Sequence, residues 1–193
     1  MNQKNAVLQY FTESAESILN NQHLSDNIVA AANKIITCFD NGGKLLICGN
    51  SGSAADAQHL SSELLNRYHR ERPELPGIAL TTDASTLTSV GNDYSYDEVF
   101  AKQIRALANP SDIVMVITTS GNSGNIIAAV NAAHEKSASC LTLNGKNGGK
   151  LSPILNDDDI DIIVDGKSTA RIQEVHGLII HCLCELIDEH ILG

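Results

Sequence analysis

Five short apolar segments recur along the chain, and helical patterns fill the intervals between them. The segments are rich in Ile, Val, Leu and Thr, as strands are, and they lie at residues 44–49, 77–82, 112–119, 139–144 and 159–165. The runs KLLI and IVMVI contain almost no polar residue, which indicates strands buried on both faces, as in parallel sheets. Helical patterns at 53–67, 96–107 and 123–136 supply the crossovers between them. The sequence therefore predicts a three-layer α/β/α sandwich around a five-stranded parallel sheet.

Helical patterns also precede and follow this predicted sheet. Apolar residues at helical spacing predict helices over 5–20 and 25–39, and a last helix over about 168–192. The chain has 193 residues and no repeat, low-complexity segment or Pro/Ser-rich linker. We therefore expect one domain over 1–193, in which residues 1–40 form a helical extension that packs on neighbouring subunits.

The charge balance argues against two classes of partner. The formal net charge is -10 and the pI is near 5.0, and Lys and Arg form no cluster, so we expect no direct binding to nucleic acid or to a membrane. No apolar run approaches the roughly 20 residues that span a bilayer, and the polar start lacks the plan of a signal peptide. Five cysteines without paired spacing fit reduced thiols better than disulfides. These features predict a cytoplasmic protein.

Two loops rich in Gly, Ser and Thr follow predicted strands. CGNSGS occupies residues 48–53, and TTSGNS occupies 118–123. In parallel sheets, ligands bind beyond the carboxyl ends of the strands, where the N–H groups of the next helix favour an anion. TTSGNS is the better phosphate cradle, because several hydroxyls and a helix start converge within it. For each loop taken alone, a turn with a Ser/Thr N-cap is the alternative.

Nucleotide-binding motifs fit these loops poorly. The first loop reads G-x-x-G instead of G-x-G-x-x-G, and the GKS at 166–168 has Asp161 where a P-loop has its first glycine. We therefore exclude dinucleotide and P-loop sites and expect the bound anion to be a phosphorylated small molecule.

His59 and Glu63 lie one turn apart on the helix predicted after the first loop, so both can reach one ion or one substrate carbon. On spacing alone, an exposed ion pair is the more common explanation. In the apolar last helix, Gln173, His176 and His181 are polar, and burial without partners costs about a few kcal/mol. His181 has apolar neighbours and needs a specific partner, whereas His176 is typical of a structural or surface histidine. The remaining histidines carry no partner pattern and are predicted to be surface or cap residues: His23, His69, His134 and His190.

Four ordered motifs resemble the sugar isomerase (SIS) domain family and, within it, the phosphoheptose isomerases. They are CGNSGSAADAQHLSSEL at 48–64, GND at 91–93, TTSGNS at 118–123 and RIQEVHGLIIH at 171–181. The resemblance covers almost the whole chain and implies a flavodoxin-like SIS fold. It also implies isomerisation of sedoheptulose 7-phosphate to D-glycero-D-manno-heptose 7-phosphate, for the heptose of bacterial lipopolysaccharide core. The resemblance further implies a homotetramer with active sites at subunit interfaces.

The same resemblance implies roles for individual residues. The zinc ligands of the family fall on His59, Glu63, Gln173 and His181. Its substrate contacts fall on Asn50, Ser51 and Gly52 in the first loop, on Asn92, Asp93 and Gln173, and on Thr118, Thr119, Ser120 and Ser123 in the phosphate loop. Position 118 is Thr where the family pattern has Ser, which keeps a hydroxyl. For an aldose–ketose exchange through an enediol, Glu63 and His181 are the acid–base pair that we assign.

Two of these implied roles conflict with simple geometry or chemistry. Gln173 and His181 are separated by about 12 Å of rise and ~80° of rotation on one helix. Either they serve one ion from different subunits, or Gln173 touches substrate instead of metal. A carboxylate bound to zinc is also a poorer base, so the zinc and base roles of Glu63 compete.

Two further hypotheses come from other classes of protein. A non-catalytic SIS adaptor that binds the bacterial replication initiator resembles this chain in FTES, AKQIRAL, ARIQE and LCELID, and Ala170 stands where isomerases usually carry an acid. Glu63 and His181, which that branch does not keep, favour the isomerase. A sugar-phosphate-sensing regulator would need a DNA-binding segment, and the residues before the first strand contain no basic module.

Overall fold

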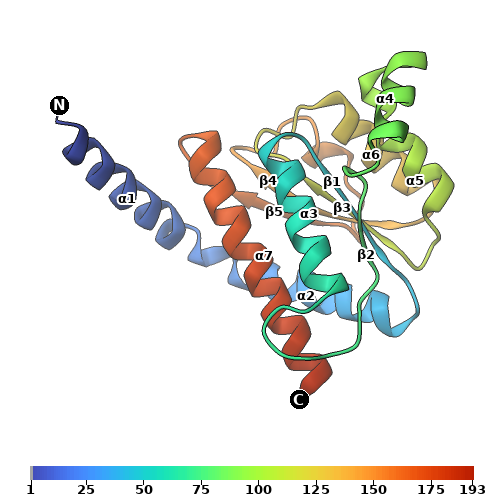
Figure 1. The fold of residues 1–193 in the computed structure, drawn as a ribbon, viewed down its shortest axis with the longest axis horizontal. Helices are drawn as coiled ribbons and strands as arrows, with labels where there is room; N and C mark the ends of the chain where they lie inside the picture. The colour runs from blue at the N-terminus through green and yellow to red at the C-terminus, as the bar shows by residue number, and fades with distance from the viewer. Residues whose placement is uncertain (1) are drawn as a thin grey trace.

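The computed structural model describes residues 2–193 and places the five strands in one parallel sheet of order β2-β1-β3-β4-β5 (Figure 1). The strands are β1 Leu45–Gly49, β2 Gly77–Ala79, β3 Ile113–Ile117, β4 Ser139–Gly145 and β5 Ile160–Val164. Each lies at a segment predicted from its apolar character. The predicted five-stranded parallel sheet is therefore confirmed.

Seven helices and three short 3-10 turns complete the described part of the chain. The helices are α1 Gln3–Asn20, α2 Ser25–Asp40, α3 Gly52–Leu65, α4 Ala84–Asp93, α5 Ala101–Leu107, α6 Gly124–Glu135 and α7 Thr169–Leu192. The turns are η1 Gln22–Leu24, η2 Tyr96–Glu98 and η3 Ser152–Ile154. Helices α2, α3 and α7 pack on one face of the sheet, and α4, α5 and α6 pack on the other. This arrangement confirms the three-layer α/β/α sandwich.

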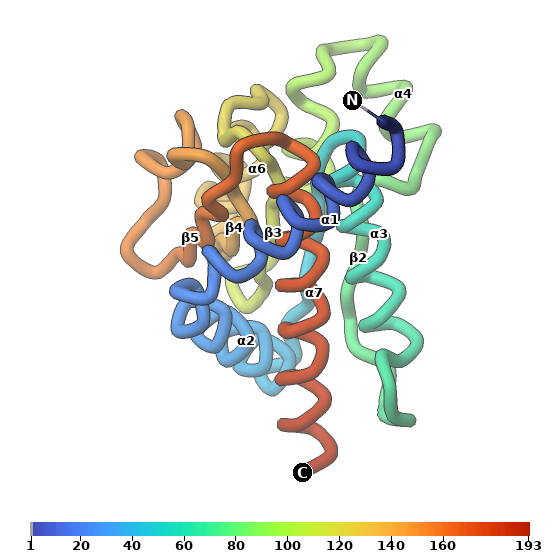
Figure 2. Tube along the Cα trace, turned by 90° about the vertical axis from the view of Figure 1, so that its left-hand side faces the viewer, coloured from blue at the N-terminus to red at the C-terminus, as the bar shows by residue number. Residues whose placement is uncertain are grey.

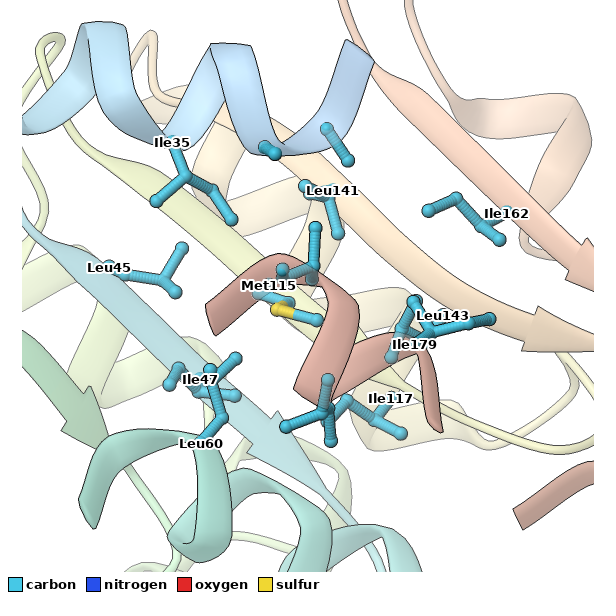
Figure 3. Close-up of a cluster of buried hydrophobic side chains, with 14 of the residues drawn as sticks. Ile35, Leu45, Ile47, Leu60, Met115, Ile117, Leu141, Leu143, Ile162 and Ile179 are labelled. Atoms are coloured by element: carbon cyan, nitrogen blue, oxygen red, sulfur yellow. The ribbon is translucent and has the colours of Figure 1, made fainter. Parts of the chain in front are cut away.

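Alternate residues of the central strands point into opposite layers. Met115 of β3 lies in register between Ile47 of β1 and Leu141 of β4, and all three pack against the face covered by α2, α3 and α7 (Figure 3). Val114 and Val116 face the opposite cluster. Because the strands are buried on both sides, their sequences are continuously apolar instead of alternating.

The region between β2 and β3 differs from the prediction. Residues 84–93 form α4, which we did not expect because Thr, Ser and Gly are weak helix formers. Its start is stabilised by Asp83, whose carboxylate accepts a hydrogen bond from the Thr86 N–H at 3.1 Å. The helix predicted over 96–107 is shorter: η2 comes first, and α5 begins only at Ala101.

Helix α1 extends away from the sheet, alongside the start of α7 (Figure 2). It is joined to the body by Asn21, whose side chain exchanges two 2.8 Å hydrogen bonds with the backbone of Asp165. None of the residues in Gln3–Asn20 is fully buried. Several large apolar side chains of this helix are exposed: Val7, Leu8, Tyr10, Phe11 and Leu19. Within residues 2–193, no helix combines the length and the apolar character needed to cross a membrane.

His176 is a core residue of α7. Its side chain is fully buried, and its Nε2 atom lies 2.9 Å from the backbone oxygen of Asn144 at the end of β4. Burial lowers the pKa of His176 to about 4, because a charged imidazole would lose its hydration there. The histidine is therefore structural, which was one of the two alternatives drawn from the sequence.

Burial of neutral His176 makes the stability of the protein depend on pH. The pKa falls from 6.5 in the unfolded chain to about 4 in the fold, so the unfolded state binds the proton first on acidification. The free energy of unfolding should therefore drop by up to about 3 kcal/mol between pH 6.5 and 4. Urea unfolding at several pH values, with His176→Leu beside the wild type, measures this term. An equally steep loss of stability in the variant over this range would contradict the assignment.

Candidate active site

The first loop leaves β1 and turns sharply into α3. Ser51 has a φ of 54° just before the helix begins. At Gly52 a Cβ atom would lie 2.2 Å from Nε2 of Gln173, so only glycine lets the α7 side chain approach this closely. The loop therefore holds its backbone against Gln173.

The second loop leaves β3 and leads into α6. The hydroxyl of buried Thr118 accepts long hydrogen bonds from the N–H groups of Ser120 at 3.4 Å and Gly121 at 3.3 Å. Gly121 has a φ of 64°, and a Cβ there would lie 2.0 Å from the backbone oxygen of Gly148. The loop thus curls tightly and presents its remaining hydroxyls at the N-terminus of α6.

A cavity of about 340 Å³ opens between the two loops, at the carboxyl ends of β1 and β3. This is the point where the strand order reverses, which is the usual ligand position in open α/β sheets. Its lining is Asn50, Ser51, Gly52, Ser53, Ile117, Thr118, Thr119, Ser120, Ser123, Thr169 and Gln173. All the residues predicted as substrate contacts in the two loops, together with Gln173, therefore meet in one cavity. None of the lining residues is Lys or Arg.

Asn92 and Asp93 lie apart from this cavity. They end α4, are exposed, and hydrogen bond to each other at 2.8 Å. Neither contributes to the cavity lining. Their role as a sugar contact stays a prediction.

The acid–base candidates gather farther along α3 and α7, which run side by side (Figures 1 and 2). Nε2 of His59 lies 3.2 Å from Oε1 of Glu63. The ring of His181 meets the ring of His59 edge-on, with centroids 5.1 Å apart, and stacks on Tyr68 at 5.8 Å. Glu63 and His181 are thus brought to the same histidine within one chain.

This cluster and the cavity are separate places within one subunit. Gly52 begins α3 and Glu63 lies 11 residues later, which corresponds to about 16 Å of helix. His59, Glu63 and His181 do not line the cavity, whereas Gln173 does. The conflict noted from helix geometry therefore persists: one α7 directs Gln173 to the loops and His181 to the cluster.

Asp56 belongs beside this cluster and was missed in the sequence. It precedes His59 by one turn of α3, and its Oδ2 atom is buried without a hydrogen-bond partner within residues 2–193. Burial raises the pKa of the Asp56 carboxyl, and the charge of His59 opposes the rise. The spacing in DAQH places an acid and a histidine on one helix face, which is the signal that could have identified it.

Asn125 and Tyr96 were also missed, and both hold the first loop. The amides of Asn50 and Asn125 exchange two 2.9 Å hydrogen bonds, and Asn125 is only 2% exposed. The Tyr96 hydroxyl donates to Oδ1 of Asn50 at 3.3 Å. No local pattern predicts these contacts, because they join the loop after β1 to η2 and α6.

A different group of side chains has the spacing of a metal site. Among the described residues, only His134, Cys140 and Asp159 form a set of three His, Cys, Asp or Glu with ligand atoms within 4.8 Å of one another. The Asp159 carboxylate already accepts hydrogen bonds from the N–H groups of Cys140 and Asn156 and lies 2.7 Å from Nε2 of His134. Burial, aided by Asp159, raises the pKa of the Cys140 thiol, which disfavours the thiolate that metals bind. We interpret the group as a structural network. His134 is partly buried in the last turn of α6 and has Asp159 as a partner, which its sequence neighbours did not indicate.

Comparisons with known proteins agree with this architecture. Residues 9–145 match the family described as the SIS domain. The chain is 53% identical, over 100% of its length and 99% of the relative, to a phosphoheptose isomerase of Alkalilimnicola ehrlichii. It is 50% identical, over 100% of its length and 98% of the relative, to a phosphoheptose isomerase of Chromohalobacter salexigens.

A solved structure gives the same result in three dimensions. The structure of a phosphoheptose isomerase from Francisella tularensis superposes with a TM-score of 0.95 at 45% identity, and the match covers 98% of this chain and 100% of that one. Together, the matched domain and the full-length similarity show that this chain belongs to the phosphoheptose isomerases of the SIS domain family.

Proposed function

We propose that the protein is an aldose–ketose isomerase that converts sedoheptulose 7-phosphate to D-glycero-D-manno-heptose 7-phosphate. The observation that carries the proposal is the pairing of a hydroxyl-lined cavity with an acid–base cluster on the same two helices, α3 and α7. Relatives named phosphoheptose isomerase match the chain over its full length. The product would supply the heptose of a lipopolysaccharide core.

The cavity suits the phosphate end of such a substrate. Three of its hydroxyl residues, Thr119, Ser120 and Ser123, belong to the loop that leads into the first N–H groups of α6. A helix N-terminus carries partial positive charge and unpaired donors, so it binds phosphate without a basic side chain. The absence of Lys and Arg from the cavity lining agrees with this mode.

The cluster suits the carbonyl end. Ketose-to-aldose conversion removes a proton from C1 of the ketose and returns one to C2, while a proton moves from the C1 hydroxyl to the C2 oxygen. The intermediate enediol needs a base for the carbon and an acid for the oxygens. Glu63 and His181, which both lie against His59, are the pair that we assign to these transfers.

Removal of either member of the pair should abolish turnover and leave the fold intact. We expect Glu63→Gln and His181→Asn each to lower kcat at least about 100-fold, because each deletes a proton-transfer group and leaves a neutral polar amide in its place. Conversion of sedoheptulose 7-phosphate is followed by separation of the two sugar phosphates. Glu71→Gln and His23→Asn are matched controls at exposed positions and should keep wild-type rates. A rate above about one hundredth of wild type in either site variant would refute the assignment.

Zinc is the cofactor that we propose for the cluster. His59, Glu63 and His181 offer nitrogen and oxygen donors of the kind that zinc takes, and they gather within one chain. Gln173 fits less well, because it faces the cavity and lies about 12 Å along α7 from His181. When bound, zinc would polarise the carbonyl and hydroxyl oxygens of the sugar.

Metal analysis tests the zinc proposal directly. Purified wild-type protein should contain bound zinc by elemental analysis, and chelation should remove it and slow conversion. His59→Gln should lose most of the metal, whereas Cys140→Ser, in the structural network, should retain it. A wild-type protein that carries no zinc after zinc supplementation, yet converts the sugar at full rate, would exclude this cofactor.

A homotetramer with active sites at subunit interfaces is the assembly that we propose. The exposed apolar side chains of α1 support this assembly. Phe11 is 74% exposed and Leu19 is 60% exposed, and exposed apolar side chains gathered on one helix are typical of a surface that contacts another subunit. We infer that residues 1–40 of the single domain 1–193 pack on neighbouring subunits. Pairing the cavity of one subunit with the cluster of another would also resolve the divergence of Gln173 and His181.

A charge placed on the apolar side of α1 should therefore break the tetramer. We expect Phe11→Lys to yield smaller species in sedimentation velocity, because a lysine would lose its hydration in an apolar interface. Gln9→Lys, on the polar side of the same exposed helix, should remain tetrameric. If Phe11→Lys sediments as the wild type does, α1 is not the contact.

We propose that the protein is located in the cytoplasm. All five cysteines are free thiols, which supports a location in the reducing cytoplasm.

The alternative function, an adaptor for the replication initiator, receives no support from the relatives above, and the cluster at Glu63 and His181 favours an enzyme. We therefore do not propose an adaptor function.

A further inference from the structure

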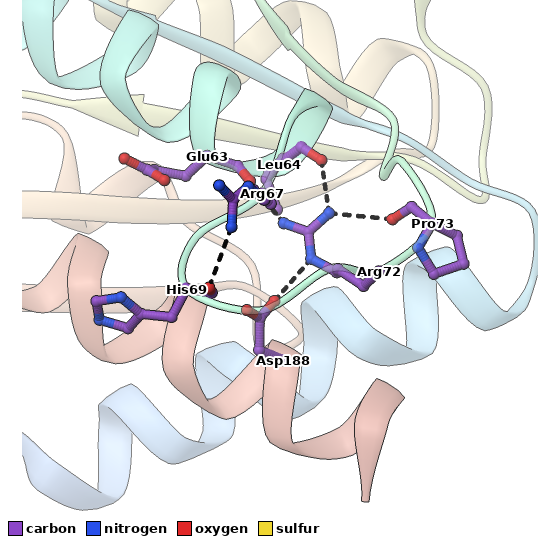
Figure 4. Close-up of polar contacts among 7 residues, drawn as sticks. All are labelled: Glu63, Leu64, Arg67, His69, Arg72, Pro73 and Asp188. Carbon is purple, nitrogen blue, oxygen red and sulfur yellow. Dashed lines mark hydrogen bonds and ion pairs between the residues drawn. The ribbon is translucent and has the colours of Figure 1, made fainter.

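Arg72 is a buried cation in the loop between α3 and β2. Its side chain is 1% exposed, and its Nε donates to Oδ1 of Asp188 on α7 at 2.7 Å. Nη1 donates to the backbone oxygens of Leu64 at 2.9 Å and Pro73 at 3.0 Å, and Nη2 donates to that of Glu63 at 2.5 Å (Figure 4). The guanidinium therefore joins the end of α3 to α7.

The α3 side of this contact is the last helical turn. Carbonyls at a helix C-terminus lack intrahelical partners, and a cation there also interacts favourably with the helix dipole. Arg72 fills that role for Glu63 and Leu64. It holds the backbone of the residue whose carboxylate is the proposed acid–base group.

The α7 side leads to His181. Asp188 lies seven residues after His181, which is two helical turns, about 10 Å, on nearly the same face. The loop that contains Arg72 also contains Tyr68, whose ring stacks on His181. The guanidinium therefore connects to Glu63 directly through its backbone oxygen, and to His181 only through α7 and through the loop that carries Tyr68.

Stability alone accounts poorly for a charged group at this place. A buried ion pair is expensive to desolvate, and an apolar pair of similar volume often stabilises a fold equally well or better. Oδ2 of Asp188 is buried without a hydrogen-bond partner in the described chain, so the pair is not even fully satisfied. What the planar fork adds is a fixed geometry between three backbone oxygens and a carboxylate.

We propose that Arg72 is a positioning residue, which acts through Asp188 to set the placement of Glu63 on α3 relative to His181 on α7. This role rests on the proposed isomerase function, but the clamp itself is a property of the fold. Arg72 touches neither the cavity lining nor the proposed phosphate loop. Its loss should therefore affect the proton transfers and not the binding of the phosphate.

Two variants separate positioning from stability. Arg72→Lys keeps the charge but loses the fork, and Arg72→Met combined with Asp188→Leu removes both charges and fills their volume. We expect both to lower kcat about 10- to 100-fold, with KM within about twofold of wild type, since small misplacements of reacting groups have effects of this size. Arg105→Lys, at a half-exposed arginine paired with Glu98 and Glu135, is the matched control and should keep wild-type kinetics.

Thermal unfolding and histidine NMR complete the experiment. With ¹³Cε1-labelled histidine, the signals of His59 and His181 should move in both variants, while that of His134 stays in place. A double variant as stable as wild type but still slow supports positioning. Wild-type kcat and unmoved His59 and His181 signals, in whichever variant folds, overturn it. If the wild type itself converts no sugar, the isomerase proposal fails, and the NMR shifts alone decide on the clamp.

Discussion

The parallel pairing of β1 with β3 determines where the site lies. Gly49 pairs with Ile117 in register, so Asn50 and Thr118 leave the sheet side by side. The segments that follow β1 and β3 then diverge, because α3 packs on one face of the sheet and α6 on the other. A cavity opens between them. The reciprocal amide pair of Asn50 and Asn125 spans the divergence and keeps the first loop in place.

A second constraint is the packing of α3 against α7. Leu60 of α3 and Ile179 of α7 are buried in the same core cluster, and the two helices are in contact (Figure 3). This contact brings His59 to His181 and leaves Asp188 facing Arg72. The helices thus connect two regions of different chemistry, with backbone N–H groups and hydroxyls at one end and titratable side chains at the other.

The acidic character of the chain is compatible with a phosphorylated ligand because the cavity does not rely on cations. With a net charge of -10, a long-range attraction for phosphate is absent, and affinity has to come from short contacts. Hydroxyls and helix N–H groups act only at hydrogen-bond distance, so they discriminate by shape as well as charge. A cavity of this kind suits a phosphate group without any basic side chain in its lining.

Local sequence determined the strands, the two loops and the i, i+4 pair of His59 and Glu63, because burial on both faces, turn chemistry and helical spacing all act over a few residues. It did not reveal α4, whose weak helix formers depend on the Asp83 cap and on packing. Nor could it reveal Arg72 with Asp188, 116 residues apart, or the Asn50–Asn125 pair. Those contacts exist only once helices are stacked on a sheet, since their partners come from different elements. Helical spacing already predicted that Gln173 and His181 of one subunit diverge. Tertiary structure decided that Gln173 faces the cavity and His181 the cluster, because the loops and α3 that form these places come from other parts of the chain.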